Sequence, residues 1–132
     1  MSRAREAHEA HQQAVSALGR SLARRAGSRC ELCASAGRLS VVEVPPTLDD
    51  PDDSRAVLAC PRCAELLQRG AARAPGDGDD ALRFLGEAIW SPTLPAQIAA
   101  VRLCRQVAAR GVPWAVDALE PLWLDEDVEA LL

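Results

Sequence analysis

Four of the five cysteines in the sequence fall into two pairs with the same internal spacing. Cys30 and Cys33 form the first pair, Cys60 and Cys63 form the second, and 26 residues separate the two pairs. Zinc takes four soft ligands in a tetrahedron at about 2.3 Å, and two such turns supply them when the chain between them folds back as a hairpin. The spacing therefore predicts one zinc ion bound by these four thiolates.

The same cysteines allow two other interpretations, a pair of disulfides or a thioredoxin-like redox pair. Disulfides belong mainly to oxidising compartments, and the residues from Met1 to Glu6 lack the apolar stretch of a signal peptide. Neither pair has the strand before it and the long helix after it that the redox motif requires. Four thiolates also leave no coordination position for water or substrate, so the zinc is expected to be structural and the protein not an enzyme.

Two short apolar runs lie between the cysteine pairs. Residues 39–44 alternate in part between apolar and polar side chains, and Pro45 and Pro46 end this run. Residues 56–59 form the second run and lead directly into the second pair. The stretch between the runs, residues 47–55, is rich in Asp and is expected to be an exposed loop. This order predicts two strands that return the chain to the first cysteine pair.

The second cysteine pair precedes a predicted helix over residues 64–69, with Gly70 as its cap. Cys63 would then begin the helix, where the helix dipole and free N–H groups lower its thiol pKa. A hairpin with one pair and a helix N-terminus with the other is the treble-clef arrangement, which we favour over an all-β zinc ribbon. The predicted fold class is α+β: a small treble-clef or zinc-ribbon module with a β-hairpin, plus a mainly helical C-terminal half.

The rest of the chain is predicted to be helical apart from one linker, which gives four segments. Residues 1–26 form an N-terminal helix that Gly27 stops, and residues 27–70 hold the four-cysteine zinc-binding module. Residues 71–80, rich in Gly and Asp, form a linker, and residues 81–132 form a helical region packed on the zinc module. The helices predicted in that region span residues 81–90, 93–110, 113–119 and 125–132.

The charge and hydropathy of the chain indicate whether it binds nucleic acid or a membrane. The formal net charge of −4 disfavours nucleic acid as a partner of the whole molecule. The first 29 residues are an exception, because they set six arginines against Glu6 and Glu9, and a local basic surface can bind phosphates. Those arginines are Arg3, Arg5, Arg20, Arg24, Arg25 and Arg29. No apolar run approaches the roughly 18 residues of a membrane span, so we expect no membrane partner and a cytoplasmic protein.

Three further residue types invite functional readings. His8 and His11 lie three apart on one helical face, but without a third ligand nearby they are expected to be a solvated pair. Cys104, among apolar neighbours on a predicted helix, is expected to be a small buried hydrophobic residue. The tryptophans are expected to be anchors that pack the C-terminal helices rather than a ligand cage: Trp90, Trp114 and Trp123.

Residues 27–33, 39–46 and 56–63 together resemble the N-terminal zinc-binding region of the PhnA-like proteins. The resemblance covers about residues 22–130. It extends into the helical part, where similar residues stand at Ile89-Trp90-Ser91, Gln97, Arg102 and Trp123-Leu124-Asp125-Glu126-Asp127. It implies family membership, and it implies an association with phosphonate use through the family name alone.

The chain departs from the PhnA-like pattern in three places. Ala34 stands where a glycine usually follows the second cysteine, and Ala81-Leu82-Arg83-Phe84 stands where a His-Trp-Arg-Cys stretch is common. The β-rich C-terminal domain of that family is also expected to be missing. The first departure concerns the turn of the cysteine knuckle. The other two remove candidate functional groups, so the resemblance implies a zinc module with helices and no catalytic mechanism.

A more distant resemblance is to the HNH nucleases, which also place cysteine pairs around a strand and before a helix. At the position of their catalytic histidine this chain reads Val42-Glu43-Val44, and its histidines, His8 and His11, lie far upstream. Without a histidine to activate water or hold a catalytic metal, hydrolysis by that mechanism is not expected.

Three classes of function follow from the sequence. The leading one is a non-catalytic protein-interaction module with a structural zinc site and a protein partner. The first alternative is a nucleic-acid-binding accessory protein of degenerate HNH or treble-clef type. The second is a small phosphonate-related enzyme, which would require a polar pocket near Glu43, Arg83 or Arg102.

Overall fold

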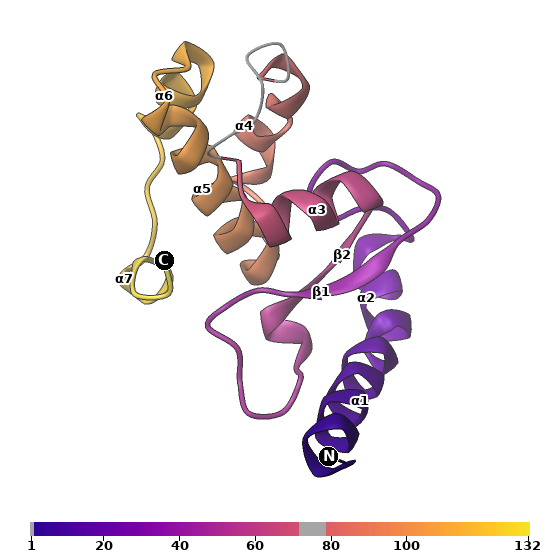
Figure 1. Cartoon of the computed structure of the whole chain (residues 1–132). Coiled ribbons are helices and arrows are strands. Elements are labelled where there is room, and N and C mark those ends of the chain that lie inside the picture. Colours follow the sequence, from indigo (N-terminus) through magenta and orange to yellow (C-terminus); the bar gives the residue numbers. More distant parts are fainter. Residues whose placement is uncertain (1, 72–78) are drawn as a thin grey trace.

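The fold combines helices with one antiparallel strand pair in a computed structural model that describes residues 2–71 and 79–132 (Figure 1). The predicted α+β class is therefore confirmed. Most of the predicted linker, residues 72–78, lies outside the described residues. The division of the chain into four segments stays a prediction.

The strand pair forms the hairpin expected between the cysteine pairs. β1 (Ser40–Glu43) runs antiparallel to β2 (Ala56–Ala59), with Ser40 opposite Ala59 and Glu43 opposite Ala56. All four residues of β2 are buried, whereas β1 is half-buried or exposed, so β2 is the inner strand. The acidic loop between them carries exposed Asp side chains and ends in a short 3-10 turn at Asp53–Arg55.

The N-terminal region forms two helices where one was predicted. α1 (Ser2–Ala17) and α2 (Gly19–Ala26) are separated at Leu18, whose N–H bonds the Val15 carbonyl three residues back at 3.1 Å. This tighter bond and the weak helix propensity of glycine at position 19 account for the break. Gly27 ends α2 at a φ of 62°, which is the stop that the sequence predicts.

The two N-terminal helices differ in how they contact the body. α1 has no buried residue; its C-terminal half lies beside β1, and its N-terminal end projects away from the body (Figure 1). α2 instead covers the hairpin, because Leu22 is fully buried against Ala56 and Leu58 of β2. Because α2 is packed on β2, it fixes the point at which the chain enters the first cysteine loop.

The helix after the second cysteine pair begins earlier than predicted. α3 spans Pro61–Arg69, with Cys60 as its N-cap and Pro61 in its first turn. Proline suits that turn because its fixed φ is helical and its missing N–H would have no partner there. Gly70, at a φ of 80°, ends the helix as expected.

The C-terminal part is built around α5 (Leu94–Ala109), which buries nine of its residues. The predicted helix over 81–90 is divided into a 3-10 turn at Asp80–Leu82 and the short α4 (Leu85–Ala88). α6 spans Pro113–Leu119, as predicted. α7 covers only Glu126–Glu129 of the predicted 125–132.

One apolar core runs through the cysteine loops and the helices. Three of the paired cysteines lie in the same buried cluster as side chains from β2, α4 and α5. The largest of these side chains include Val57, Leu85, Ile89, Ile98 and Val101. The metal-binding loops and the C-terminal helices therefore share a single hydrophobic interior.

The tryptophans do not all serve as the expected anchors. Trp114 is half-buried against the core, but Trp90 is 52% exposed and Trp123 is 75% exposed. The expectation is therefore wrong for Trp90 and Trp123, because α5 fills the interior with aliphatic side chains instead. Among the described residues, no helix is both long and apolar enough to cross a membrane.

Candidate metal centre

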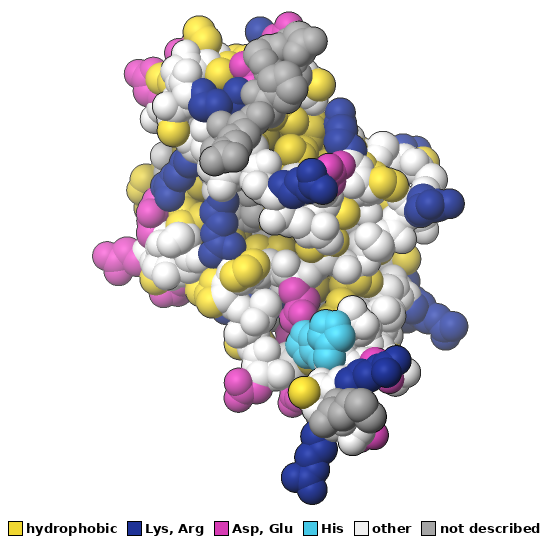
Figure 2. Space-filling model, viewed as in Figure 1, with side chains coloured by type: hydrophobic (Ala, Val, Ile, Leu, Met, Phe, Trp, Pro, Cys, Tyr) yellow, Lys and Arg dark blue, Asp and Glu magenta, His cyan; other side chains and the backbone are white. Residues whose placement is uncertain are grey.

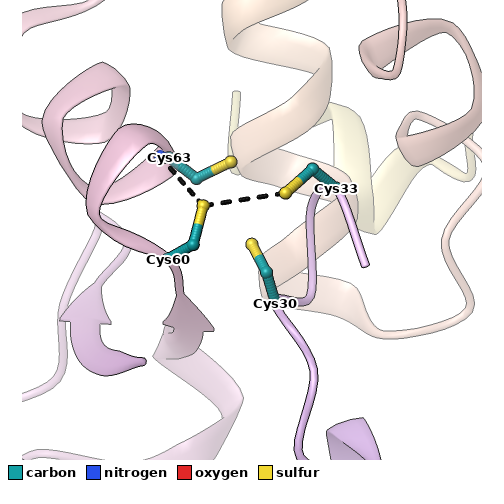
Figure 3. A group of neighbouring side chains, drawn as sticks. All are labelled: Cys30, Cys33, Cys60 and Cys63. Atoms are coloured by element: carbon teal, nitrogen blue, oxygen red, sulfur yellow. Dashed lines mark hydrogen bonds between the residues drawn. The ribbon is translucent and has the colours of Figure 1, made fainter. Parts of the chain in front are cut away.

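The four paired cysteines converge on one point between the first cysteine loop and the start of α3 (Figure 3). Their sulfur atoms all lie within 4.8 Å of one another, although residues as far apart in sequence as Cys30 and Cys63 contribute. All five cysteines of the chain are free thiols, so the disulfide alternative is contradicted. The four side chains are positioned to bind a metal ion.

The spacing of the sulfurs fits tetrahedral coordination. A tetrahedron with metal–sulfur bonds of about 2.3 Å sets its sulfurs about 3.8 Å apart. Cys33 Sγ and Cys60 Sγ, from different pairs, lie 3.6 Å apart. Cys30, Cys60 and Cys63 are buried and Cys33 is half-buried, so the protein surrounds most of the site.

The first cysteine pair sits in a tight turn closed by backbone hydrogen bonds. Cys30 N–H donates to the Ser35 carbonyl at 2.9 Å, and Ala34 N–H donates to the Cys30 carbonyl at 2.9 Å. Ala34 adopts a φ of 66°, the left-handed region that favours glycine. The alanine that departs from the PhnA-like pattern therefore occupies a position with a conformational preference for glycine.

The second cysteine pair uses the N-terminus of α3. Cys60 caps this helix, and its sulfur accepts the N–H of Cys63 at 3.5 Å. The prediction that Cys63 begins the helix is wrong by one turn: Cys63 is the third helical residue, and Cys60 is the one that accepts from the free backbone N–H group. Pro61 causes the difference, since it starts the helix immediately after Cys60.

The thiols differ in how readily they lose a proton. The hydrogen bond from the Cys63 thiol to the Cys30 sulfur lowers the pKa of Cys30 to about 4. The same bond, together with burial, raises the pKa of Cys63, contrary to the prediction of a lowered value. Burial disfavours the charged form of Cys33, but hydrogen bonds with Ser35 outweigh it and lower the pKa of Cys33. A thiolate is thus available at neutral pH to begin metal binding.

Arg62 places a positive charge beside the sulfurs. Burial lowers the pKa of its guanidinium, but a hydrogen bond with Cys33 and the charges of the neighbouring thiolates outweigh this and raise it. The guanidinium also lies 4.8 Å from the ring centre of Phe84. A divalent ion with four thiolates has a net charge of −2, so Arg62 offsets part of the charge of such a centre.

An ion pair between Arg25 and the buried carboxylate of Glu31 holds the first cysteine loop in place. Arg25 Nη2 and Nε donate to the two carboxylate oxygens of Glu31 at 2.7 and 2.9 Å. Glu31 Oε1 also accepts the N–H of Leu58 at 2.9 Å, and Arg25 donates to the carbonyls of Asp53 and Ala56. The pair joins α2, the first cysteine loop and β2. No spacing rule predicts this contact, because Arg25 and Glu31 read as ordinary surface residues.

The histidines do not form the solvated pair that was expected. His8 is exposed, whereas His11 Nε2 lies 2.6 Å from Glu43 Oε1 on β1. Glu43 and Arg102 also border a cavity of about 90 Å³, and Arg83 instead pairs with Asp80 at 3.3 Å. This cavity is smaller than the roughly 300–1,000 Å³ of typical small-molecule sites. Within the described residues, the paired cysteines are the only converging group of three or more His, Cys, Asp or Glu side chains.

Comparisons of the chain with protein-family models, curated proteins and solved structures gave no match. The resemblances to the PhnA-like proteins and to the HNH nucleases therefore stay predictions.

Proposed function

We propose that the protein is a non-catalytic interaction module whose fold depends on one structural zinc ion. The convergence of Cys30, Cys33, Cys60 and Cys63 is the observation that carries this proposal. A tetrahedral set of four thiolates is typical of structural zinc, and zinc in such a set has no open position for substrate. The side chains near the centre supply no other catalytic group, because the described histidines lie on α1 and His11 is bonded to Glu43.

Membership of the PhnA-like family belongs to the same proposal, with any link to phosphonates implied by the family name alone. We also place the protein in the cytoplasm, because five free thiols persist best in a reducing compartment. A protein partner is part of the proposal as well. It is supported by the large apolar side chains at the surface, Trp90, Val116 and Trp123.

Elemental mass spectrometry of protein purified without added metal tests the proposal. We expect one zinc per chain, its loss in Cys60→Ser, and its retention in Cys104→Ser, because Cys104 lies in the apolar core away from the metal centre. A wild-type chain without zinc, or a Cys60→Ser chain that keeps it, would refute the structural site.

A further inference from the structure

A groove lies between the N-terminal helices and the hairpin, next to the first cysteine loop. It encloses about 510 Å³ and is lined largely by small side chains, among them Ser16, Gly19 and Ala23 from the helices and Ser28 and Ser40 beyond them. A Cβ added at position 19 would lie 3.7 Å from Val41 in its floor. The lining has no acidic side chain, and its small residues and hydroxyls let an extended polar chain approach the backbone closely.

Four arginines belong to the segments that line this groove. Each is exposed and is the sequence neighbour of a lining residue; they are Arg20, Arg24, Arg29 and Arg38. Figure 2 shows arginine side chains projecting from the edge of the molecule where Figure 1 places α2 and the first cysteine loop. In the part of the chain that the structure describes, none of the four forms an ion pair with an acidic side chain.

The segment that builds the groove is basic although the whole chain is acidic. Residues 12–42 contain five arginines and one acidic residue, Glu31, which the ion pair with Arg25 neutralises. The remaining acidic residues lie outside this segment, mainly in the 47–55 loop and in the C-terminal half. Charges more than about 8 Å apart are largely screened at physiological salt, so a ligand in the groove responds mainly to the charges near it.

From this arrangement we propose that the groove binds the phosphate backbone of a nucleic acid duplex. Four arginines without acidic partners match a polymer that carries one negative charge per about 1.7 Å of its axis. The residues that line the groove include no aromatic side chain, so the groove has no platform on which single-stranded bases could stack. Recognition is therefore of the backbone and independent of base sequence. This inference rests on the proposed function in one respect, because the cysteine centre holds the loop that forms one wall of the groove.

The test is fluorescence anisotropy of a labelled DNA duplex titrated with the zinc-loaded full chain. Four phosphate contacts predict a slope of log affinity against log salt near −3.6, or an affinity loss on the order of 100-fold between 50 and 200 mM NaCl. We expect dissociation constants in the range of about 1–100 μM near physiological salt and tighter binding at 50 mM NaCl. Absence of binding there, or a slope near zero, would overturn the inference.

Matched charge reversals locate the binding surface. Arg24→Glu with Arg38→Glu changes the net charge as much as Arg69→Glu with Arg83→Glu, whose arginines are exposed on α3 and beside the Asp80–Leu82 turn. We expect the first pair to weaken binding at least tenfold and the second pair to change it less than threefold. Equal losses in the two variants would show that net charge alone controls binding, and the groove would be excluded.

Two further measurements separate this inference from the proposed function. Zinc content and melting temperature are recorded for every variant. A chain that is folded and loaded with zinc but does not bind the duplex refutes only the groove assignment. Polyglutamate of matched charge serves as a competitor. If it displaces the duplex at equal charge concentration, the groove takes an acidic protein and the nucleic acid assignment fails.

Discussion

At the scale of single residues, Ala34 closes the first cysteine turn in a conformation that alanine adopts at a cost. Its φ of 66° places the Cβ close to the following carbonyl oxygen, a strain of roughly 1–2 kcal/mol that glycine avoids. The two hydrogen bonds of the turn hold Ala34 there despite this strain. The metal-binding turn is thus shaped by its backbone bonds as well as by the cysteines.

Replacing this alanine is expected to stabilise the protein. Ala34→Gly should raise the free energy of unfolding by about 1 kcal/mol, the strain relieved less the extra freedom that glycine gives the unfolded chain. Chemical denaturation of the zinc-loaded protein measures it. Ala36→Gly, at a neighbouring exposed position without a positive φ, is the control and should not stabilise. A destabilised Ala34→Gly chain would contradict the argument.

Cys104 is expected to be chemically inert in the folded protein. Burial raises the pKa of its thiol, so at any pH below that value the reactive thiolate is scarcer than in a free cysteine. With the paired cysteines bound to metal, alkylation by iodoacetamide at mildly alkaline pH should label almost no thiol in the native chain. Denaturant with a chelator should expose all five. Fast labelling of Cys104 in the native protein, located by peptide mass spectrometry, would contradict its burial.

At the scale of elements, the Arg25–Glu31 pair joins three parts of the chain that sequence patterns treat separately. Glu31 is 4% exposed and has the guanidinium of Arg25 and the N–H of Leu58 as partners. Loss of one partner leaves a buried charge without compensation, which typically costs 3–5 kcal/mol. The pair therefore contributes to the position of the first cysteine loop as well as to stability.

A double-mutant cycle measures this contribution. Arg25→Ala is expected to lower the free energy of unfolding by about 3 kcal/mol, and Glu31→Gln by less, because the guanidinium that it leaves unpaired reaches solvent. The double variant should lose clearly less than the sum of the two, with a coupling of roughly 1–3 kcal/mol. Arg24→Ala, the exposed neighbour on α2, is the control and should stay within about 0.5 kcal/mol of wild type. Additive losses would mean that the two side chains act independently.

Sequence patterns among neighbouring residues predicted most helices and strands. Contacts between residues far apart in sequence could not be predicted in this way. The cysteine spacing predicted the metal-binding set, and Gly27, Gly70 and Pro113 marked helix ends because each acts on its own backbone. The bond between His11 and Glu43 spans 32 residues, and no local pattern encodes it. Trp123 is exposed for the same reason, since which apolar side chains reach the interior is decided by the packing of the whole chain.

At the scale of the whole molecule, the cysteine centre and the C-terminal helices share one core. Cys60 and Cys63 belong to the same buried cluster as Leu85 on α4 and Ile98 on α5. Zinc bound by four thiolates supplies a folding free energy of about 10 kcal/mol or more, which is comparable to the total stability of a small domain. Metal loss should therefore reach well beyond the cysteine loops.

Metal removal provides the corresponding prediction. A chelator added in excess should abolish the far-UV helical signal and shift the tryptophan emission in one transition, because α5 loses the core that covers it. Zinc added back to the reduced chain should restore both signals. If the helical signal survives complete chelation, the helices fold without the metal, and the shared core does not couple the two halves.

The partial exposure of Cys33 affects the rate at which the metal exchanges. Three of the four sulfurs are buried, and Cys33 alone is half-exposed. A competing ligand or an oxidant therefore meets Cys33 first, and displacement of the ion begins at that sulfur. The affinity for an ion bound here would depend on all four thiolates, whereas the rate of its displacement would depend mainly on the accessibility of Cys33.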